Sequence, residues 1–400
     1  MKYVLLILDG ATDAPRPELE GRTPLMVARM PHLREMVRQG NIGVARPLPA
    51  EAAIDPEAAL LACFGYYPPD WWTGRGPLEA AALDIPLDRR DVAFRANLIH
   101  TDGERLLDPT AGRITDRWAR PLVEHLAERL RGRFLQLYPG HGYRHVLVWH
   151  DGPTDLGCTN PREIAGEPLA VHYPVGDRAE RLRRLMEDSY EILSAHPLNR
   201  QREDRGLPPA TMIWPWGGGL PTRLPPFGFR HGLGGALIAG HPLARGIGRL
   251  AGLAVPDLPE ATGTRDTDYT VKAKAALAML PSHDFVAVHI YAPHDAAQDG
   301  DWEAKIDALQ RIDERLLGPL LDRIGTIADF RILVVVDHPT PSATRRAEPG
   351  WTPFLLTGNR EKPRPPRLPF DERALDEASW RIEEPDRLLE PLFAPMAATP

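Results

Sequence analysis

Two aspartates stand at the ends of long apolar runs near opposite ends of the chain, and one of them is followed by a histidine. Residues 331–338 are Arg-Ile-Leu-Val-Val-Val-Asp-His, and residues 3–10 are Tyr-Val-Leu-Leu-Ile-Leu-Asp-Gly. A carboxylate and an imidazole at the end of a strand suit a divalent metal ion or acid–base chemistry. The alternative for such a pair is a polar loop in which the aspartate caps a turn. We treat Asp9, Asp337 and His338 as one candidate site.

The elements that must position this site are two strands. Both apolar runs are continuous rather than alternating, which predicts strands buried on both faces. Strand-like runs alternate with helical ones at both ends of the chain, which favours an α/β fold with a doubly wound, mostly parallel sheet. Because the carboxyl ends of parallel strands meet at one edge, we expect Asp9 and Asp337 to be neighbours.

The middle of the chain has strand and helix signals of its own. We expect residues 86–180 to form an inserted, smaller α+β lobe, and residues 1–85 and 181–400 to form the core. Residues 208–226 contain Trp-Pro-Trp-Gly-Gly-Gly and are predicted to be irregular, because proline and glycine interrupt regular elements.

Composition and charge exclude several classes of protein. An apolar fraction of 43% in 400 residues is enough for two or three domains, or for one large domain with an insertion. The net charge of -7 argues against a general nucleic-acid surface. No apolar run reaches the roughly 18 residues of a membrane span, so we expect no membrane contact and a cytoplasmic location. Two cysteines, Cys63 and Cys158, cannot form a disulfide framework or a cysteine-rich zinc site.

Several motifs occur in a fixed order along the chain. They are Asp9-Gly, Trp72-Thr-Gly-Arg-Gly-Pro-Leu-Glu-Ala80, Asp91-Val-Ala-Phe-Arg-Ala-Asn97, Tyr143-Arg-His145 and Asp337-His-Pro-Thr-Pro341. With them the chain resembles the archaeal-type, 2,3-bisphosphoglycerate-independent phosphoglycerate mutases of the alkaline phosphatase superfamily. The resemblance implies two divalent metals, typically manganese, a transiently phosphorylated serine, and an inserted lobe whose arginines hold the phosphoglycerate.

The resemblance also shows departures at the positions that carry this chemistry. Asp9, Asp337 and His338 match one metal site, but the nucleophilic serine falls on Pro56. In the other metal site the three ligands fall on His294, Gln298 and Ala347. His294 could still bind a metal, whereas glutamine and alanine cannot rebuild the coordination. We therefore expect one divalent metal, Mn, Zn or Mg, rather than two.

Four residues that would hold the substrate in the family are retained, and they are Arg75, Arg95, Asn97 and Arg144. An arginine usual in the family is Trp216 here. Arginine forks match phosphate and carboxylate, so the retained residues form a candidate anion site. The alternative for each arginine is an ordinary salt bridge.

Three functions stay open. The chain is a divergent homologue that has lost mutase chemistry and binds a small anionic metabolite or a protein partner. Alternatively, Asp9, Asp337, His338 and His294 hold one metal in a phosphohydrolase or lyase that uses water as its nucleophile. The third possibility is a working mutase whose serine lies elsewhere in the chain. The sequence contains no signal for the oligomeric state.

Overall fold

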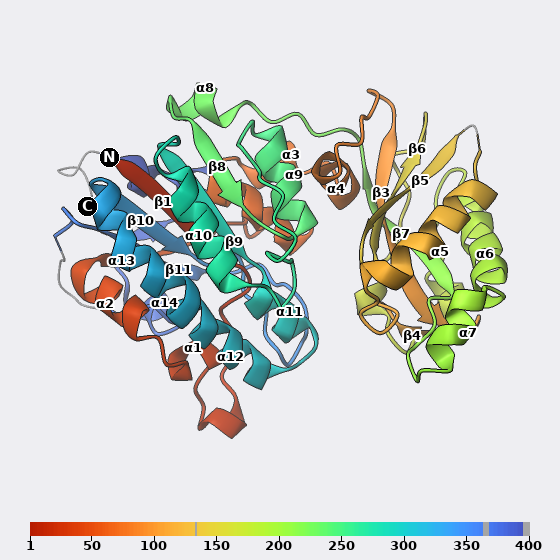
Figure 1. Cartoon of the computed structure of the whole chain (residues 1–400), viewed down its shortest axis with the longest axis horizontal. Helices are drawn as coiled ribbons and strands as arrows, with labels where there is room; N and C mark the ends of the chain where they lie inside the picture. The colour runs from red at the N-terminus through yellow and green to blue at the C-terminus, as the bar shows by residue number, and fades with distance from the viewer. Residues whose placement is uncertain (133, 363–367, 395–400) are drawn as a thin grey trace. The chain divides into compact units, whose positions relative to one another are not determined.

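The structure is a computed structural model that describes residues 1–132, 134–362 and 368–394 (Figure 1). The chain forms two compact units, one made of Met1–Trp72 with Leu224–Pro400 and the other of Thr73–Arg223. The second unit is wider than the lobe of residues 86–180 expected from the sequence. The reason is packing: the helix at Arg75–Ala82 and the strand at Met212–Gly219 both contact the strand at Val92–Thr101.

The first unit contains a seven-stranded sheet in the order β12-β2-β11-β10-β1-β9-β8. Four of its six strand pairs are parallel, and β11 is antiparallel to both of its neighbours. The expected α/β fold with a mostly parallel sheet is confirmed. Its strands are β1 (Lys2–Leu8), β2 (Asn41–Ala45), β8 (Gly235–Ile238), β9 (Phe285–Ile290), β10 (Phe330–Val335), β11 (Thr352–Gly358) and β12 (Arg381–Ile382).

Helices of the first unit follow or connect these strands. The α-helices are α1 (Pro24–Val27), α2 (Pro31–Gln39), α3 (Pro68–Trp71), α8 (Phe227–His231), α9 (Pro242–Leu250), α10 (Tyr269–Met279), α11 (Ala292–Gln298), α12 (Trp302–Ile312), α13 (Gly318–Ile327), α14 (Ala374–Glu377) and α15 (Glu390–Phe393). The 3-10 helices are η1 (Pro17–Leu19), η2 (Pro56–Phe64) and η6 (Pro385–Arg387), and the π-helix η5 (Asp313–Leu317) joins α12 to α13.

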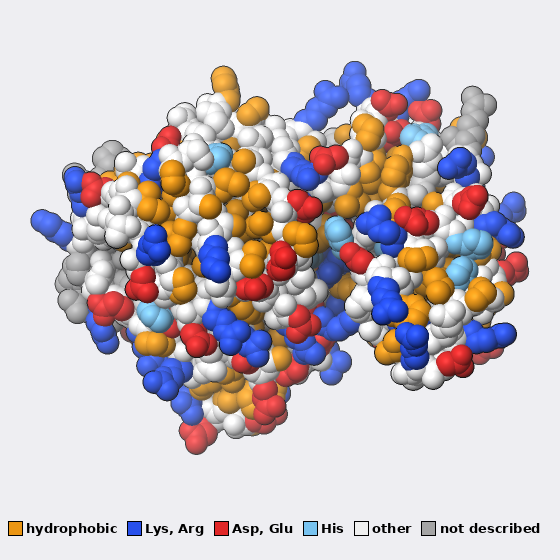
Figure 2. Space-filling model, in the orientation of Figure 1, with side chains coloured by type: hydrophobic (Ala, Val, Ile, Leu, Met, Phe, Trp, Pro, Cys, Tyr) orange, Lys and Arg blue, Asp and Glu red, His pale blue; other side chains and the backbone are white. Residues whose placement is uncertain are grey.

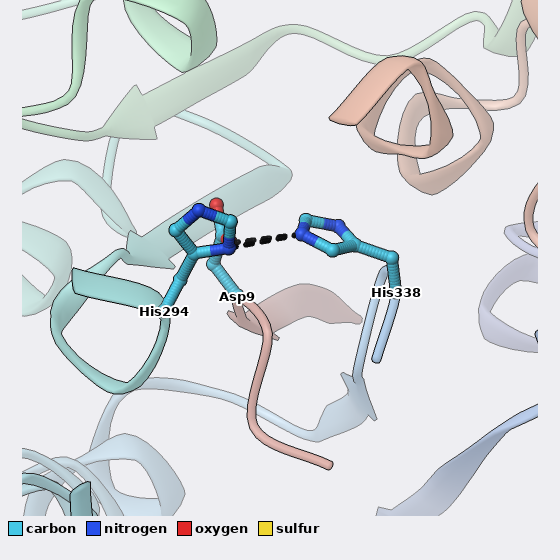
Figure 3. Close-up of side chains that lie close together, drawn as sticks. All are labelled: Asp9, His294 and His338. Carbon is cyan, nitrogen blue, oxygen red and sulfur yellow. Dashed lines mark hydrogen bonds and ion pairs between the residues drawn. The ribbon is translucent and has the colours of Figure 1, made fainter. Parts of the chain in front are cut away.

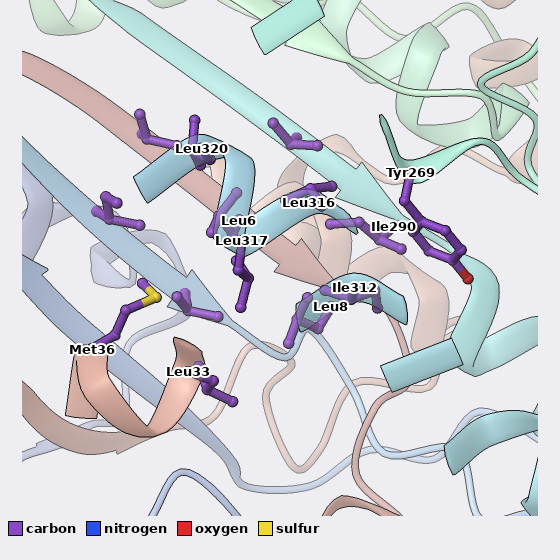
Figure 4. Packing of buried hydrophobic residues seen from close by; sticks show 14 of the residues in the cluster. Leu6, Leu8, Leu33, Met36, Tyr269, Ile290, Ile312, Leu316, Leu317 and Leu320 are labelled. Carbon is purple, nitrogen blue, oxygen red and sulfur yellow. The ribbon is translucent and has the colours of Figure 1, made fainter. Parts of the chain in front are cut away.

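The core of the first unit lies between the central strands and one layer of helices. Alternate residues of β1, which are Val4, Leu6 and Leu8, point into this layer and are fully buried. Figure 4 shows Leu6 and Leu8 among side chains from α2, α10, α12, η5 and α13. The remaining residues of the run, Leu5 and Ile7, are also fully buried, so β1 is covered on both faces, as its continuous apolar run predicts.

The register of the three central strands sets the position of the candidate site. Leu8 of β1 lies opposite Ile290 of β9, and Ile7 lies opposite Val335 of β10. All three strands run in the same direction, so the residues that follow them leave at one edge of the sheet. Asp9, helix α11 and the Asp337-His338 pair therefore start side by side, as expected for the two aspartates.

The second unit is built on an antiparallel sheet. Its order is β4-β3-β6-β5, and β7 pairs with β3. The strands are β3 (Val92–Thr101), β4 (Leu106–Asp108), β5 (Leu135–His141), β6 (Arg144–Trp149) and β7 (Met212–Gly219), and the helices are α4 (Arg75–Ala82), α5 (Asp116–Arg129), α6 (Glu180–Ser194), α7 (Pro197–Glu203), η3 (Pro161–Glu163) and η4 (Leu169–Val171).

Strand β7 corrects the expectation that residues 208–226 are irregular. Its Trp214 and Trp216 are buried, and Pro215 lies opposite Ala96 of β3. Among the strands that the structure describes, β7 pairs with β3 alone, so its other side is an edge that tolerates proline. Burial of the two indoles outweighs the weak strand propensity of proline and glycine.

Acidic and basic side chains are interspersed over the visible face of the molecule (Figure 2). In the described residues, no helix is long and apolar enough to cross a membrane.

Candidate metal centre and arginine cluster

Three buried side chains of the first unit form a group that could hold a metal ion. They are Asp9 after β1, His294 on α11 and His338 after β10, and Figure 3 shows them pointing toward one another. The His294 Nδ1 atom lies 3.0 Å from His338 Nε2 and 3.3 Å from Asp9 Oδ1, and His338 Nε2 lies 3.7 Å from the same Asp9 oxygen. The structure thus brings together three of the four predicted metal residues.

The turn after β1 makes room for this group. Gly10 has a φ of 59°, a left-handed conformation that glycine adopts without strain. A Cβ atom at this position would lie 2.5 Å from Thr340 Oγ1 and 2.8 Å from His294 Cβ. Glycine is therefore required here both by the backbone and by the histidine that packs against it.

Asp337, the fourth predicted metal residue, lies beside His338 and outside the group of three. Its Oδ2 atom is 3.0 Å from His338 Nδ1. Its Oδ1 atom accepts hydrogen bonds from the backbone N–H groups of Gly10 and His338, at 3.1 and 3.0 Å. Asp337 thus orients the His338 ring, which is the usual task of a carboxylate behind a metal-binding histidine.

Asp9 and His294 also have ionisable neighbours, and the sequence interpretation missed one of them, His289. His289 on β9 is fully buried, and its Nε2 lies 2.7 Å from Asp9 Oδ2. Glu57 on η2 is almost fully buried, and its Oε1 lies 4.0 Å from His294 Nε2. His289 had a visible signal, since it is the one polar residue in the strand Phe-Val-Ala-Val-His-Ile.

Burial and the carboxylates decide the charges of these histidines. Burial disfavours the charged form of His338, but Asp337 and then Asp9 and Glu57 outweigh it and raise the pKa of His338 to about 9. Burial lowers the pKa of His289 to about 3, although Asp337 opposes the change. The acidic neighbours favour positive charge at the centre, whether a proton or a metal ion supplies it.

Of the positions matched to the nucleophile and the second metal site, His294 belongs to this group, whereas Pro56, Gln298 and Ala347 do not. Pro56 is the first residue of η2, where its lack of an N–H group costs nothing, and Asp55 caps the helix by accepting a hydrogen bond from the backbone N–H of Glu57 at 3.0 Å. The Gln298 Oε1 atom accepts a hydrogen bond from the Tyr291 hydroxyl at 3.3 Å. Ala347 contributes only a methyl group.

The four predicted anion-binding residues lie in the second unit, where a shared carboxylate joins two of them. Glu79 Oε1 accepts from Arg75 Nε at 2.8 Å and from Arg95 Nη1 at 3.1 Å, and all three side chains are buried. Arg95 Nε donates to Asn97 Oδ1 at 2.9 Å. We call Arg75, Glu79, Arg95, Asn97 and Arg144 the arginine cluster.

The arginine cluster is held between two aromatic rings. Trp216 donates its Nε1–H group to Asn97 Oδ1 at 3.1 Å, and the guanidinium groups of Arg75 and Arg95 lie 5.3 and 5.2 Å from the centre of its ring. Arg144 lies 4.5 Å from the ring centre of Tyr143. Burial, with Arg75 and Arg144 nearby, lowers the pKa of Arg95, and Glu79 opposes this. Arg75 and Arg95 thus share the Glu79 carboxylate.

The chain resembles known proteins over almost its whole length. A family model described as 2,3-bisphosphoglycerate-independent phosphoglycerate mutase matches residues 37–199. A probable 2,3-bisphosphoglycerate-independent phosphoglycerate mutase of Geobacter sulfurreducens is 39% identical, with 98% of this chain and 99% of the relative covered. The mutase of Methanothrix thermoacetophila is 42% identical, with 90% and 91% covered.

Solved structures share the fold. The PH0037 protein from Pyrococcus horikoshii has a TM-score of 0.78 and 24% identity, and covers 100% of this chain and 99% of its own. The cofactor-independent phosphoglycerate mutase from Thermoplasma acidophilum has a TM-score of 0.58 and 26% identity, with 98% and 99% covered. Together with the relatives, these matches show that the chain belongs to the 2,3-bisphosphoglycerate-independent phosphoglycerate mutase family.

Proposed function

We propose that this chain is a divergent member of the family that does not interconvert phosphoglycerates through a phosphorylated serine. The observation that carries the proposal is Pro56, which stands where the resemblance places the nucleophile. A proline side chain has no oxygen to attack phosphorus or to bind a metal. Residues 50–62 contain no serine, threonine or histidine that could replace it.

The metal ligands support the same conclusion. Gln298 is engaged with Tyr291, Ala347 has no donor atom, and His294 lies within one group with Asp9 and His338. One three-residue group replaces the two sites that the family's chemistry uses. We therefore propose a single divalent metal for this chain.

The arginine cluster supports binding of a small anion. The cluster gathers three buried guanidinium groups, those of Arg75, Arg95 and Arg144. A phosphorylated or carboxylated metabolite carries the opposite charge, and guanidinium forks match the geometry of both groups. The proposed activity is recognition of such an anion.

A second candidate is a single-metal phosphohydrolase or lyase acting on the same class of metabolite. The observation that favours it is the intact group of Asp9, His294 and His338, with the Glu57 carboxylate 4.0 Å from His294. A bound divalent metal lowers the pKa of water and so supplies a nucleophile at neutral pH. In that case Asp337 and Glu57 would hold the two histidine rings in place.

The test is a phosphoglycerate mutase assay on the purified chain with added Mn²⁺, with the 39% identical Geobacter sulfurreducens relative assayed in parallel. We expect no turnover of 3-phosphoglycerate to 2-phosphoglycerate. Turnover that disappears in Asp337→Ala would overturn the proposal. Release of phosphate from phosphorylated substrates, lost in the same variant, would favour the second candidate.

Anion recognition is tested by calorimetric titration with 3-phosphoglycerate. Arg95→Lys keeps the charge but loses the paired N–H groups, so binding should weaken by about tenfold, as expected for loss of one charged hydrogen bond. Arg129→Lys, on the exposed side of α5, is the matched control. Equal binding by both variants would exclude the arginine cluster as the anion site.

A further inference from the structure

We infer that Asp9, His294 and His338 form a nitrogen-rich site for one tetrahedral transition-metal ion, and that this site favours Zn²⁺ over the harder ions Mn²⁺ and Mg²⁺. The inference rests on the proposed function, in which one metal replaces two, and it adds the identity of the ion. It draws on donor chemistry, donor spacing and the outer contacts of each ligand.

Donor chemistry is the first support. The site offers two imidazole nitrogens and one carboxylate oxygen. Imidazole suits zinc, copper, iron and nickel, whereas carboxylates and water suit magnesium and manganese. Two imidazoles with one carboxylate is also the ligand set of known catalytic zinc sites, which leave a fourth position for water or substrate.

Donor spacing is the second support. Zinc bonds of about 2.0–2.1 Å in a tetrahedral arrangement place neighbouring donor atoms roughly 3.3 Å apart. The three observed separations are 3.0 Å between His294 Nδ1 and His338 Nε2, 3.3 Å between His294 Nδ1 and Asp9 Oδ1, and 3.7 Å between His338 Nε2 and Asp9 Oδ1. They bracket the tetrahedral value, so an ion of this size fits with small side-chain shifts.

The outer contacts of the ligands are the third support. His338 presents Nε2 to the group because Asp337 lies 3.0 Å from its Nδ1. His294 presents Nδ1, which also lies 2.9 Å from Thr340 Oγ1, and the Glu57 carboxylate lies 4.0 Å from its other nitrogen. A contact as close as that of Asp337 fixes the tautomer of a metal-binding histidine and makes it a stronger ligand.

The oxygen ligand is oriented in the same way. Asp9 directs Oδ1 to the two histidines, while Oδ2 lies 2.7 Å from His289 Nε2. His289 is fully buried on β9, so it holds the carboxylate from the strand beneath. Asp9 and His338 are thus each oriented toward the group by a residue outside it.

The experiment uses the full chain after removal of metals by dialysis against a chelator. Titration calorimetry with Zn²⁺, Mn²⁺ and Mg²⁺ should give one equivalent of Zn²⁺ bound at least about 100-fold more tightly than Mn²⁺. Co²⁺, a spectroscopic substitute for zinc, should give the intense visible absorption of a tetrahedral ion. Two equivalents of metal, or the weak absorption of an octahedral ion, would overturn the inference.

Most protein sites bind Zn²⁺ more tightly than Mn²⁺, so this preference alone does not identify the ligands. The deciding comparison is the ratio of the two affinities in the wild-type chain and in variants of the site. His294→Asp restores an oxygen donor and should reduce the Zn²⁺ to Mn²⁺ affinity ratio by about tenfold or more. Asp337→Asn should weaken Zn²⁺ binding by roughly 10–100-fold through the orientation of His338. An unchanged ratio in His294→Asp would show that His294 is not a ligand.

His141→Asn is the matched control for nonspecific binding by histidine, since His141 lies in the second unit with a side chain 64% exposed. It should leave Zn²⁺ binding unchanged, and a loss of the single equivalent in this variant would refute the assigned site. These measurements are independent of the mutase assay. Turnover with Mn²⁺ would refute the proposed function, whereas a site without zinc preference would refute only the inference on metal identity.

Discussion

Replacing Lys305 by methionine removes a buried ammonium group that joins the two loops of the candidate metal centre. Lys305 on α12 is fully buried, and its Nζ donates to Thr12 O at 2.9 Å, Thr340 O at 2.8 Å and Asp13 Oδ2 at 2.9 Å. Thr12 follows Asp9 by three residues, and Thr340 follows His338 by two. Loss of the ammonium therefore affects both loops together.

The expected cost follows from what Lys305→Met leaves behind. The Asp13 carboxylate stays buried, still accepting from the backbone and hydroxyl of Ser342, but without its counter-charge. Removing one partner of a buried ion pair costs about 3–5 kcal/mol. Methionine has a similar volume, so a cavity adds little. Since each 1.4 kcal/mol corresponds to a factor of ten, the first unit should open roughly 10²- to 4 × 10³-fold more often.

Hydrogen–deuterium exchange with mass spectrometry measures this opening for each unit. Amides of β1 and β10 should lose protection by that factor, while those of β3 and β6 in the second unit serve as an internal reference. Lys274→Met, at an exposed lysine on α10, is the matched control. A loss of less than about threefold in Lys305→Met would refute the reasoning, because the ion pair would then contribute less than about 1 kcal/mol.

Two further predictions concern the same unit. Burial raises the pKa of Glu372 to about 7 from 4.5, against hydrogen bonds from Thr23 and from the backbone of Asp13. Between pH 4.5 and about pH 7 the folded state keeps a proton on Glu372 that the unfolded state has released. The free energy of unfolding should therefore fall by up to about 3 kcal/mol as the pH rises through this range. Glu372→Gln should abolish that slope in urea unfolding, and an unchanged slope would assign it to other groups. Gly10→Ala should destabilise the chain by more than the roughly 1–2 kcal/mol of left-handed strain, because its Cβ collides with neighbours. Gly21→Ala is the control, because Gly21 also has a positive φ but has open space around it. If both variants lowered the melting temperature equally in thermal unfolding, the collision at Gly10 would be contradicted.

The sequence by itself determined the two central strands β1 and β10. It also determined that Asp9, Asp337 and His338 lie at the carboxyl edge of their sheet. Continuous apolar runs before Asp9 and Asp337 are compatible with a buried strand whatever surrounds them, and parallel strands must end at a common edge. The family also followed from local motifs, and the relatives confirm it. Pro56 is likewise visible in the sequence, because a proline excludes a nucleophile without any knowledge of its neighbours.

Only the tertiary structure decided which atoms face the centre. Asp337 lies behind His338, and His294 turns Nδ1 toward Asp9, because side-chain directions depend on contacts with residues some 280 to 330 positions away. The contacts of Glu57 and His289 arise in the same way, from elements far apart in the chain. The extent of the second unit also depended on long-range pairing, since β7 becomes a strand by burying Trp214 and Trp216 against β3. Local sequence specifies which residues occupy the end of a strand, whereas packing between distant segments specifies where their side chains point.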